Sequence, residues 1–147
     1  MEEEDNSLLD LRPVLIHIDC LKEHEECDPD YLEELLEKIV KDGELKRPII
    51  VDSRTMIILD GHHRFLCIKK LGKRYIPAYL IDYSRPEIEV CSWNNTETIT
   101  KEMVIEAALT GKKFPPKSTK HMVKIGGELY HITYIEKEHP YPLHAIP

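Results

Sequence analysis

Apolar and polar residues recur with clear periods along the first third of the chain. Residues 14–18 alternate between two dissimilar faces, which is the period of two expected of a strand. Asp28 followed by Pro29 predicts a helix start, because a carboxylate caps free amides while proline needs no donor at the first helical position. Apolar residues follow at helical spacing as far as Gly43, which ends the predicted helix.

Four more elements are predicted before residue 83. Strands at 48–51 and 56–59 are joined by a short polar segment whose composition favours a turn. A short helix at 65–71 and a strand at 76–81 follow. The order of elements over residues 13–82 is therefore β, α, β, β, α, β.

The sequence pattern of the second half of the chain predicts fewer helices and strands. Thr98 or Thr100 caps a helix that ends at Gly111. A polar loop at 112–121 then leads to two strands that flank the glycine pair 126–127, which is typical of a two-residue hairpin.

Together these patterns predict an α+β fold. A break near residues 84–86 separates the two parts of the chain. We expect an acidic flexible leader at 1–7, a β-α-β-β-α-β core at 8–90, and a small C-terminal extension at 91–147 that consists of a helix and a β-hairpin.

Composition narrows the class of protein. The chain has 147 residues and a formal net charge of −7, and 41% of its residues are hydrophobic, which suits one small soluble α/β domain. Its apolar runs fall far short of the roughly 20 residues that a membrane span needs, and its acidic start differs from the basic start of a signal peptide. The four cysteines form no CxxC pair, so we expect reduced thiols. We therefore expect a cytoplasmic protein with no membrane partner.

Charge is unevenly distributed along the chain. Residues 2–5 supply four of the seven excess negative charges, whereas five lysines between residues 112 and 124 lie in a stretch without any acid. An anion could be received there, although a solvated lysine face is the alternative. The overall acidic balance makes non-specific nucleic-acid binding unlikely, since such binding depends on neutralising phosphates. Abundant Glu, Lys and Ile and the absence of Gln match a composition found in proteins of hot environments.

The densest polar cluster is Asp60-Gly61-His62-His63-Arg64, where an apolar strand gives way to an amphipathic helix. The first amides of a helix are unpaired and attract anions, and glycine lets a phosphate approach the backbone. Arg64 can bind phosphate oxygens through two parallel hydrogen bonds, and either histidine can donate to the bridging oxygen of a departing phosphoryl group. Asp60 would repel a bare phosphate, so we expect it to hold Mg²⁺.

Two other interpretations of this cluster stay open. Asp60 could be a simple helix cap, with the histidines and Arg64 on the helix surface. Zinc is the other candidate ligand, but adjacent histidines on a helix diverge by about 100°, and neither an HExxH motif nor a cysteine partner accompanies them. The position directly after four consecutive apolar residues favours the phosphate site.

A known family carries the same motifs. The span from Leu11 to Tyr83, with "PDYLEELLEKIVKDGELKRPIIV", "MIILDGHHR" and "KKLGKRYIPAYLID", resembles the ParB/sulfiredoxin superfamily, and DGHHR resembles the signature of its free L-serine kinase branch. The likeness continues more loosely through Trp93 and "FPPKSTKH" at residues 114–121, a loop that in that branch helps to enclose the substrate. The resemblance implies transfer of a phosphoryl group from ADP or ATP to the hydroxyl of free L-serine, with Mg²⁺, giving O-phospho-L-serine for cysteine biosynthesis.

The resemblance also implies catalytic roles. Glu25 in "KEHEEC" aligns best with the family's general base, and Glu26 is the neighbouring contender. A carboxylate suits this role because it accepts the hydroxyl proton as the oxygen attacks. His62 and His63 are the other expected catalytic residues, and they bind phosphate together with the rest of the turn.

Substrate-binding roles follow from the same likeness. Lys38 is implied to meet the serine carboxylate, and Trp93 to line the pocket. The loop at 114–121 is implied to add four further contacts, from Lys117, Ser118, Thr119 and His121.

The sister branches of the superfamily fit less well. Sulfiredoxins need a cysteine beside the His-Arg pair of this turn, and His62 stands there instead. The chromosome-partitioning proteins have a Glu-Arg-Arg turn and a following helix-turn-helix domain, whereas this chain predicts one clear helix beyond residue 90. A nucleotide-binding regulatory module without kinase turnover is the second hypothesis.

Overall fold

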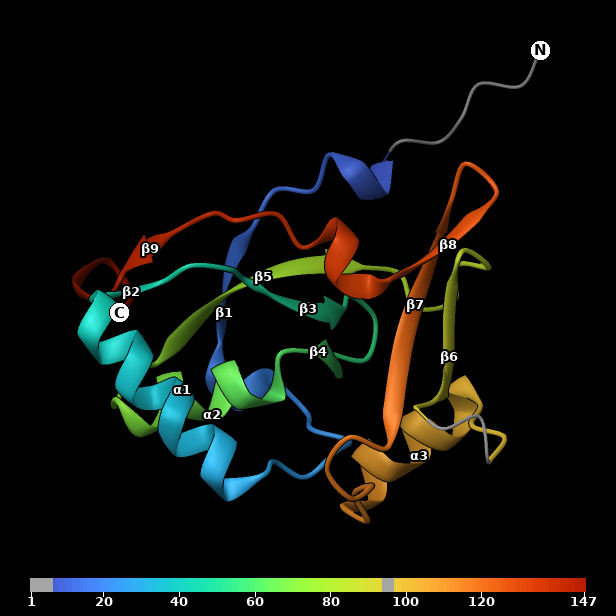
Figure 1. The fold of residues 1–147 in the computed structure, drawn as a ribbon, viewed down its shortest axis with the longest axis horizontal. Coiled ribbons are helices and arrows are strands. Elements are labelled where there is room, and N and C mark those ends of the chain that lie inside the picture. Colours follow the sequence, from blue (N-terminus) through green and yellow to red (C-terminus); the bar gives the residue numbers. More distant parts are fainter. Residues whose placement is uncertain (1–6, 94–96) are drawn as a thin grey trace.

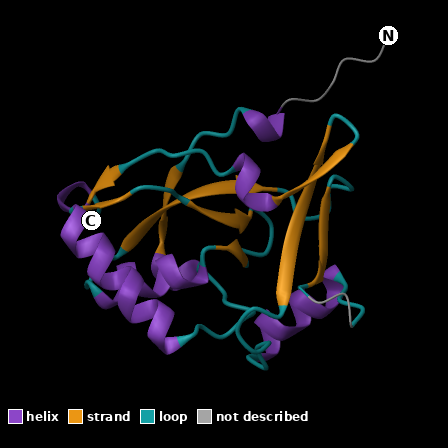
Figure 2. Ribbon diagram, in the orientation of Figure 1, coloured by secondary structure: helices purple, strands orange, loops and turns teal. Residues whose placement is uncertain are grey.

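The computed structural model describes residues 7–93 and 97–147. Within these residues the chain forms three α-helices, nine strands and four short 3₁₀ turns (Figures 1 and 2). The helices are α1 (Pro29–Asp42), α2 (His62–Lys70) and α3 (Lys101–Thr110). The strands are β1 (Val14–His17), β2 (Glu44–Leu45), β3 (Ile49–Asp52), β4 (Ile58–Asp60), β5 (Tyr75–Ile81), β6 (Ile88–Ser92), β7 (Thr119–Ile125), β8 (Glu128–His131) and β9 (Tyr141–Pro142). The 3₁₀ turns are η1 (Ser7–Leu9), η2 (Ile18–Cys20), η3 (Ile132–Ile135) and η4 (Leu143–Ala145).

The first half of the chain builds a four-stranded sheet in the order β1-β5-β3-β4. Strand β3 is parallel to β5, while β1 and β4 are antiparallel to their neighbours. Helices α1 and α2 pack against each other below this sheet in the view of Figure 1. All four residues of β3 are buried, as an inner strand requires. The predicted β-α-β-β-α-β order is confirmed for this sheet and its two helices, and the two-residue strand β2 between α1 and β3 is an additional element.

A second sheet in the order β6-β7-β8 carries the predicted hairpin. Gly126 and Gly127 have φ of 60° and 82°, as a tight turn between twisted strands requires. Strand β6 was not expected, and β7 begins at Thr119 although residues 112–121 were predicted to be loop. The expected boundary near residue 90 falls inside β6, and one hydrophobic cluster contains residues from both sides of it.

The predicted ends of α1 and α3 match the structure, whereas α2 begins at His62, three residues before its predicted start. Asp28 caps α1 by accepting hydrogen bonds from the amides of Asp30 and Tyr31, and Gly43 ends it with φ of 68°. Thr100, one of the two expected caps, accepts from the amide of Met103 and caps α3. These local signals act through backbone groups within one turn, which is why the sequence alone contains them.

The pairing of β2 with β9 was not predicted, because each strand has only two residues.

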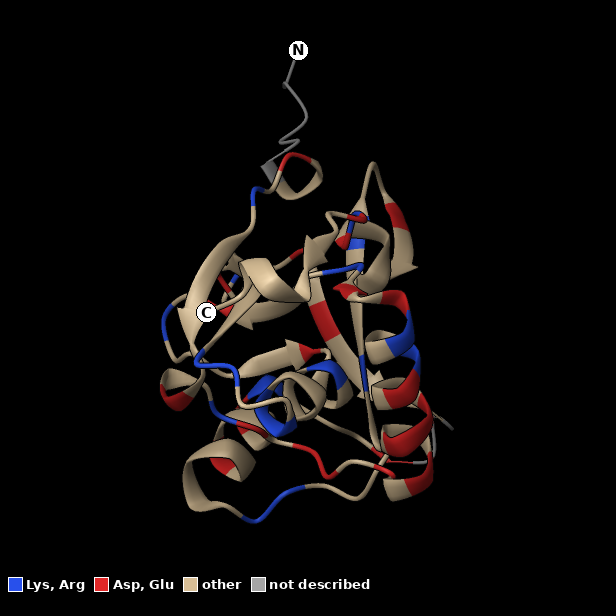
Figure 3. Ribbon diagram, turned by 90° about the vertical axis from the view of Figure 1, so that its left-hand side faces the viewer, with Lys and Arg blue, Asp and Glu red and all other residues tan. Residues whose placement is uncertain are grey.

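The acidic leader falls mostly on residues 1–6, which lie outside the described residues. No helix in the described part of the chain has the length and apolar character to cross a membrane. Acidic residues predominate along α1, with basic ones toward its C-terminal end (Figure 3).

Candidate active site

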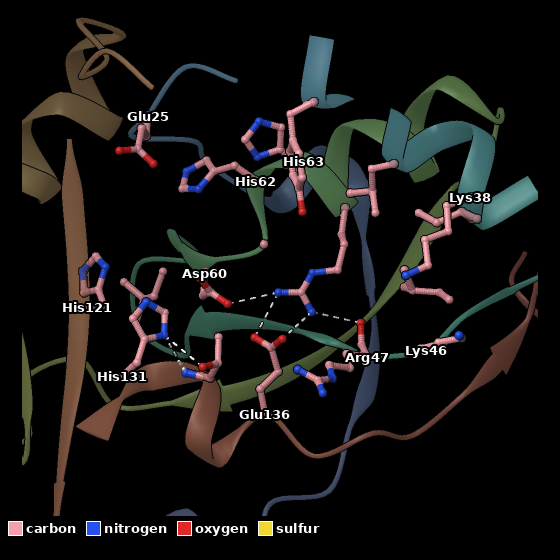
Figure 4. A pocket seen from close by; sticks show the side chains of 18 of the residues that line it. Glu25, Lys38, Lys46, Arg47, Asp60, His62, His63, His121, His131 and Glu136 are labelled. Carbon is pink, nitrogen blue, oxygen red and sulfur yellow. Dashed lines mark hydrogen bonds and ion pairs between the residues drawn. The ribbon is translucent and has the colours of Figure 1, made fainter. Parts of the chain in front are cut away.

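A pocket of about 730 Å³ lies where the two halves of the fold meet (Figure 4). Its walls come from the loop before α1, from α1 itself, from the β4–α2 turn, from the start of β7 and from η3 with the segment after it. Eleven of the twelve predicted site residues line it: Glu25, Lys38, Asp60, Gly61, His62, His63, Arg64, Trp93, Lys117, Thr119 and His121. The twelfth, Ser118, reaches the site through its backbone amide.

The β4–α2 turn forms one wall of the pocket. Strand β4 ends at Asp60, and Gly61 is the N-cap of α2, with φ of 103° and no side-chain cap. A Cβ at Gly61 would lie 2.5 Å from Cγ2 of Ile49 and 2.9 Å from a terminal nitrogen of Arg64, so only glycine fits. The alternative in which Asp60 caps a helix with surface histidines is wrong, since Gly61 is the cap and His62 is buried.

The two histidines of the turn fasten the preceding loop onto α2. Nε2 of His62 accepts a hydrogen bond from the amide of His24 at 3.2 Å, and Nε2 of His63 accepts from the amide of Asp28 at 3.0 Å. Burial lowers the pKa of both imidazoles below the usual value. Each neutral ring with an accepting Nε2 therefore carries its proton on Nδ1.

Glu25 sits in the loop that the histidines hold. One of its oxygens, Oε1, accepts hydrogen bonds from the amides of Ser118 at 2.6 Å and Thr119 at 2.9 Å. The other oxygen, Oε2, has no hydrogen-bond partner among residues 7–93 and 97–147. Burial raises the pKa of Glu25 even though these amides oppose the shift. Glu26 is exposed and does not line the pocket, so the geometry favours Glu25 as the base.

Lys117 shapes the turn that presents these two amides. Its φ of 58° lies in the left-handed region, which is uncommon for a residue other than glycine. Such a residue next to successive amides creates a concave anion-binding arrangement, and here the carboxylate of Glu25 occupies it. The loop is fixed further by paired backbone hydrogen bonds between residues 24–26 and Phe114.

Arg64 is placed differently from its expected role. Its two terminal nitrogens donate to both oxygens of Glu136, at 2.7 and 3.0 Å, and to Oδ2 of Asp60 at 3.0 Å. The carbonyls of Arg47 and Pro48 accept further hydrogen bonds from the same group. The terminal nitrogens of Arg64 thus orient Asp60 and Glu136, and a bidentate contact with phosphate would require exchange of one of these partners.

Glu136 was missed by the sequence interpretation. It is 4% exposed, and burial together with Asp60 raises its pKa to about 8, while the pKa of Asp60 is lowered by Glu136 and Arg64. The one local signal was its position directly after η3, in which Ile132 and Ile135 are buried. Asp60, Arg64 and Glu136 thus form one buried cluster of ionisable groups under the turn, in which the charge of Asp60 neutralises that of Arg64 (Figure 4).

The donor set at Asp60 fits Mg²⁺ in a limited way. No group of three or more His, Cys, Asp or Glu side chains in the described chain could hold a metal ion, which argues against the zinc alternative. Mg²⁺ is commonly bound by one or two carboxylates together with phosphate oxygens and water. Asp60 lines the pocket and contacts Arg64 through Oδ2 and not through Oδ1, so it suits that kind of site.

The ends of the pocket differ in charge. Lys38, Lys46 and Arg47 line one end near the C-terminus of α1 (Figure 4). Lys46 pairs with Asp42 at 3.5 Å and Arg47 with Glu138 at 3.8 Å, while Lys38 has no ion pair within the described ranges. Only Lys38 was predicted, because Lys46 and Arg47 join the site through the fold and carry no local motif.

The other end contains aromatic and imidazole rings. Trp93 is 49% exposed and donates from Nε1 to the carbonyl of Thr119 at 3.0 Å. His121 is buried against the hydroxyl of Tyr83 at 2.8 Å, and burial lowers its pKa to about 3. His131, which the sequence interpretation missed, lies near Asp60 and 5.7 Å from Trp93 between ring centroids (Figure 4).

Several curated proteins are similar to this chain, although no protein-family model matches it. The chain is 39% identical over 87 residues to an ATP-dependent L-serine kinase of Staphylothermus marinus, covering 56% of this chain and 34% of that protein. It is 43% identical over 74 residues to a ParB-like protein of Sulfolobus acidocaldarius, covering 50% and 37%. It is 32% identical over 84 residues to the ADP-dependent L-serine kinase SerK of Thermococcus kodakarensis, covering 54% and 35%. The chain thus spans about a third of the length of these relatives.

Solved structures share the fold over most of the chain. A conserved hypothetical protein from Pyrococcus furiosus superposes with a TM-score of 0.77 at 17% identity, covering 93% of this chain and 98% of that one. Free serine kinase in complex with AMP superposes with a TM-score of 0.70 at 16% identity, covering 85% and 94%. The expected α+β fold and the resemblance to the free L-serine kinase branch are confirmed: this chain has the fold of free serine kinase and is similar to L-serine kinases over about half its length.

Proposed function

We propose that this protein is a phosphotransferase that moves a phosphoryl group from ATP or ADP to the hydroxyl of free L-serine. One observation carries the proposal: the fold brings the Asp60–Arg64 turn into one pocket with Oε2 of Glu25, which has no hydrogen-bond partner among the described residues. Relatives named as ATP-dependent and as ADP-dependent L-serine kinases support the class of reaction and keep both donors open.

The chain's own groups fit the steps of such a transfer. The first amides of α2 have no partner within the helix and no side-chain cap, so they are available for the phosphate being transferred. The Nδ1–H groups of His62 and His63 are the remaining donors of these rings, because Nε2 of each is already bound to the preceding loop. Charged oxygens of the nucleotide would thus be met by neutral donors that need no reorganisation.

Glu25 suits the role of general base. As the serine oxygen attacks phosphorus, its O–H bond breaks and the proton moves to Oε2 of Glu25. The new O–P bond forms while the bond from phosphorus to the bridging oxygen breaks, and that oxygen leaves with the electron pair on the shortened nucleotide. Mg²⁺ at Asp60, when bound, would supply charge neutralisation of the phosphates. A raised pKa makes Glu25 a better proton acceptor than an exposed glutamate.

The cationic end of the pocket supports an anionic substrate group. Lys38 remains the proposed partner of the serine carboxylate, and Lys46 and Arg47 extend the same positive surface. We also propose that the protein uses Mg²⁺, is located in the cytoplasm, comes from a thermophilic source and contributes to cysteine biosynthesis.

The proposal is tested by incubating purified protein with ATP or ADP, Mg²⁺ and L-serine, and following O-phospho-L-serine by phosphorus NMR. Glu25→Gln should retain nucleotide binding and lose turnover by about 100-fold or more, since general-base catalysis contributes about 10²–10⁴-fold. Glu26→Gln is the matched control and should keep near-parental rates. Absence of product from the parental protein with either nucleotide would refute the kinase function.

A second candidate is a nucleotide-binding module without turnover. The similarity to a ParB-like protein of Sulfolobus acidocaldarius is the observation that favours it. Nucleotide binding measured by calorimetry, together with no phosphorylated product from any small alcohol, would support this module over the kinase.

A further inference from the structure

The hydroxyl of Thr119 lies between Glu25 and a buried histidine. Its Oγ1 is 3.0 Å from Nε2 of His24 and 3.3 Å from Oε1 of Glu25. A hydroxyl has one proton, so Thr119 can donate to only one of these two acceptors at a time. Which one receives the proton decides how strongly the negative charge of Glu25 is stabilised.

The environment of His24 settles this choice. Its Nδ1 is 2.8 Å from the carbonyl oxygen of Ile58, which can only accept, so Nδ1 must carry a proton. His24 is fully buried, and that burial lowers its pKa to about 4, so the ring is neutral at neutral pH. Nε2 of a neutral ring with a protonated Nδ1 is an acceptor. Oε1 of Glu25 is also within reach of the Thr119 hydroxyl, at 3.3 Å, but Nε2 of His24 lies closer, at 3.0 Å, and has no proton of its own, so the single proton is assigned to the bond with His24.

Glu25 then meets the hydroxyl oxygen of Thr119 without a proton between them. Oxygen lone pairs at 3.3 Å repel an ionised carboxylate, whereas a donated hydrogen bond would stabilise it. The two backbone amides still hold Oε1 in place. The two backbone amides thus orient Glu25, while the Thr119 hydroxyl does not stabilise its negative charge.

We propose that His24 is a positioning residue that acts through the Thr119 hydroxyl to keep Glu25 more basic. Its importance for catalysis rests on the proposed kinase function, but its effect on Glu25 is a property of the ligand-free protein. His24 touches neither phosphate nor serine in this scheme, so it is distinct from the general base itself.

We call the chain of contacts from His24 through the Thr119 hydroxyl to Glu25 the relay. Other ionisable groups face this relay from several elements. The ring of His24 lies edge-on to His62 and His121, with centroids 4.5 and 5.5 Å away, and burial lowers the pKa of both. The charge of Asp60 shifts the pKa of both Glu25 and His24 upward, although burial leaves the pKa of His24 lowered overall. The loop around Glu25 adds Cys27 and the Glu23–Lys113 ion pair. All of these groups are unchanged in the variants below, so they cancel in the comparison.

The test uses two substitutions of His24 that separate its two nitrogens. His24→Asn places an amide where Nδ1 was and removes the acceptor at Nε2, which frees the Thr119 hydroxyl to turn to Glu25. His24→Gln places an amide oxygen near the former Nε2 and keeps an acceptor for Thr119. The pH midpoint of the Glu25 carboxyl carbon is measured by NMR in the ligand-free protein, with Glu25→Gln used to assign the signal.

We expect the midpoint to fall by roughly one pH unit in His24→Asn, which is the order of magnitude of one charge-assisted hydrogen bond. It should stay near the parental value in His24→Gln. In a Thr119→Val background no hydroxyl is available, so adding His24→Asn should leave the midpoint where Thr119→Val alone puts it.

Two results would overturn the role of His24. One is an unchanged or higher midpoint in His24→Asn, and the other is an equal fall with and without the Thr119 hydroxyl. In His24→Asn, the acid limb of the pH profile of kcat with L-serine should move to lower pH together with the NMR midpoint. If the midpoint moves as expected and the parental protein makes no O-phospho-L-serine, the kinase function fails while the relay stands.

Discussion

Replacing Gly61 with alanine tests whether the β4–α2 turn depends on close backbone packing. The new Cβ would lie 2.5 Å from Cγ2 of Ile49, which is wholly buried, and 2.9 Å from a terminal nitrogen of Arg64. The backbone φ of 103° adds strain of about 1–3 kcal/mol for a side chain in that region. Overpacking in a well-packed core adds about 1–3 kcal/mol. The expected loss in the free energy of unfolding is therefore roughly 2–6 kcal/mol.

Gly111→Ala is the matched control. Gly111 also has a positive φ, 76°, but a Cβ there meets nothing within 4 Å. Urea unfolding followed by circular dichroism gives the free energy of unfolding of both variants and of the parental protein. Because both substitutions introduce a side chain at positive φ, the difference between them isolates most of the steric effect at the turn.

The same substitution should weaken nucleotide binding. Arg64 must move away from the new methyl group, and its movement would displace Asp60, to which it is bound at 3.0 Å. Calorimetry with ADP under conditions where each variant is folded should show loss of affinity in Gly61→Ala and parental affinity in Gly111→Ala. If Gly61→Ala is no less stable than Gly111→Ala and binds ADP equally well, the close packing assigned to this turn is not needed.

Three further predictions follow from the buried charges and the single tryptophan. His24 and His121 have folded-state pKa values of about 4 and about 3, below the ordinary 6.5, so the folded state binds fewer protons than the unfolded state between these values. The stability that these neutral rings contribute should be fully present above pH 6.5 and fall as the pH drops toward 4, by about 3 kcal/mol for His24 alone, while the raised pKa of Glu136 acts in the opposite direction; urea unfolding from pH 7 to pH 4.5 that shows the same change for the parental protein and for His24→Gln would contradict the assigned neutral ring of His24. Glu136→Leu removes the bidentate hydrogen-bond acceptor of the buried Arg64 guanidinium, whose charge Asp60 still neutralises, and should lower the free energy of unfolding by about 1–3 kcal/mol; a loss below about 1 kcal/mol would show that Asp60 and the two carbonyls suffice. Trp93 is the chain's one tryptophan and lines the pocket, so its fluorescence should change on addition of ADP or L-serine; binding seen by calorimetry without any change in emission would place the ligand away from Trp93.

Several elements in both halves of the fold could be predicted from local patterns. The caps of α1 and α3, the strand period near residue 14 and the glycine turn at 126–127 act within a few residues, so the sequence contains them directly. Strand β6 was missed because its five residues give only a short and irregular alternation, and its partner β7 comes after α3 in the chain. The β2–β9 pair escaped because two-residue strands leave no periodic signal.

For the site, the sequence alone determined which residue types could carry the chemistry: the DGHHR turn after a buried strand, and a carboxylate in the loop before the first helix. Only the tertiary structure decided how they are used. It brings Glu136 from 72 residues away onto Arg64 and the amides of Ser118 and Thr119 from 93 and 94 residues away onto Glu25. Such contacts depend on the docking of the second sheet and the segment after it against the first. Because charges and hydrogen-bond donors are paired across that junction and not along the chain, no local pattern could have assigned them.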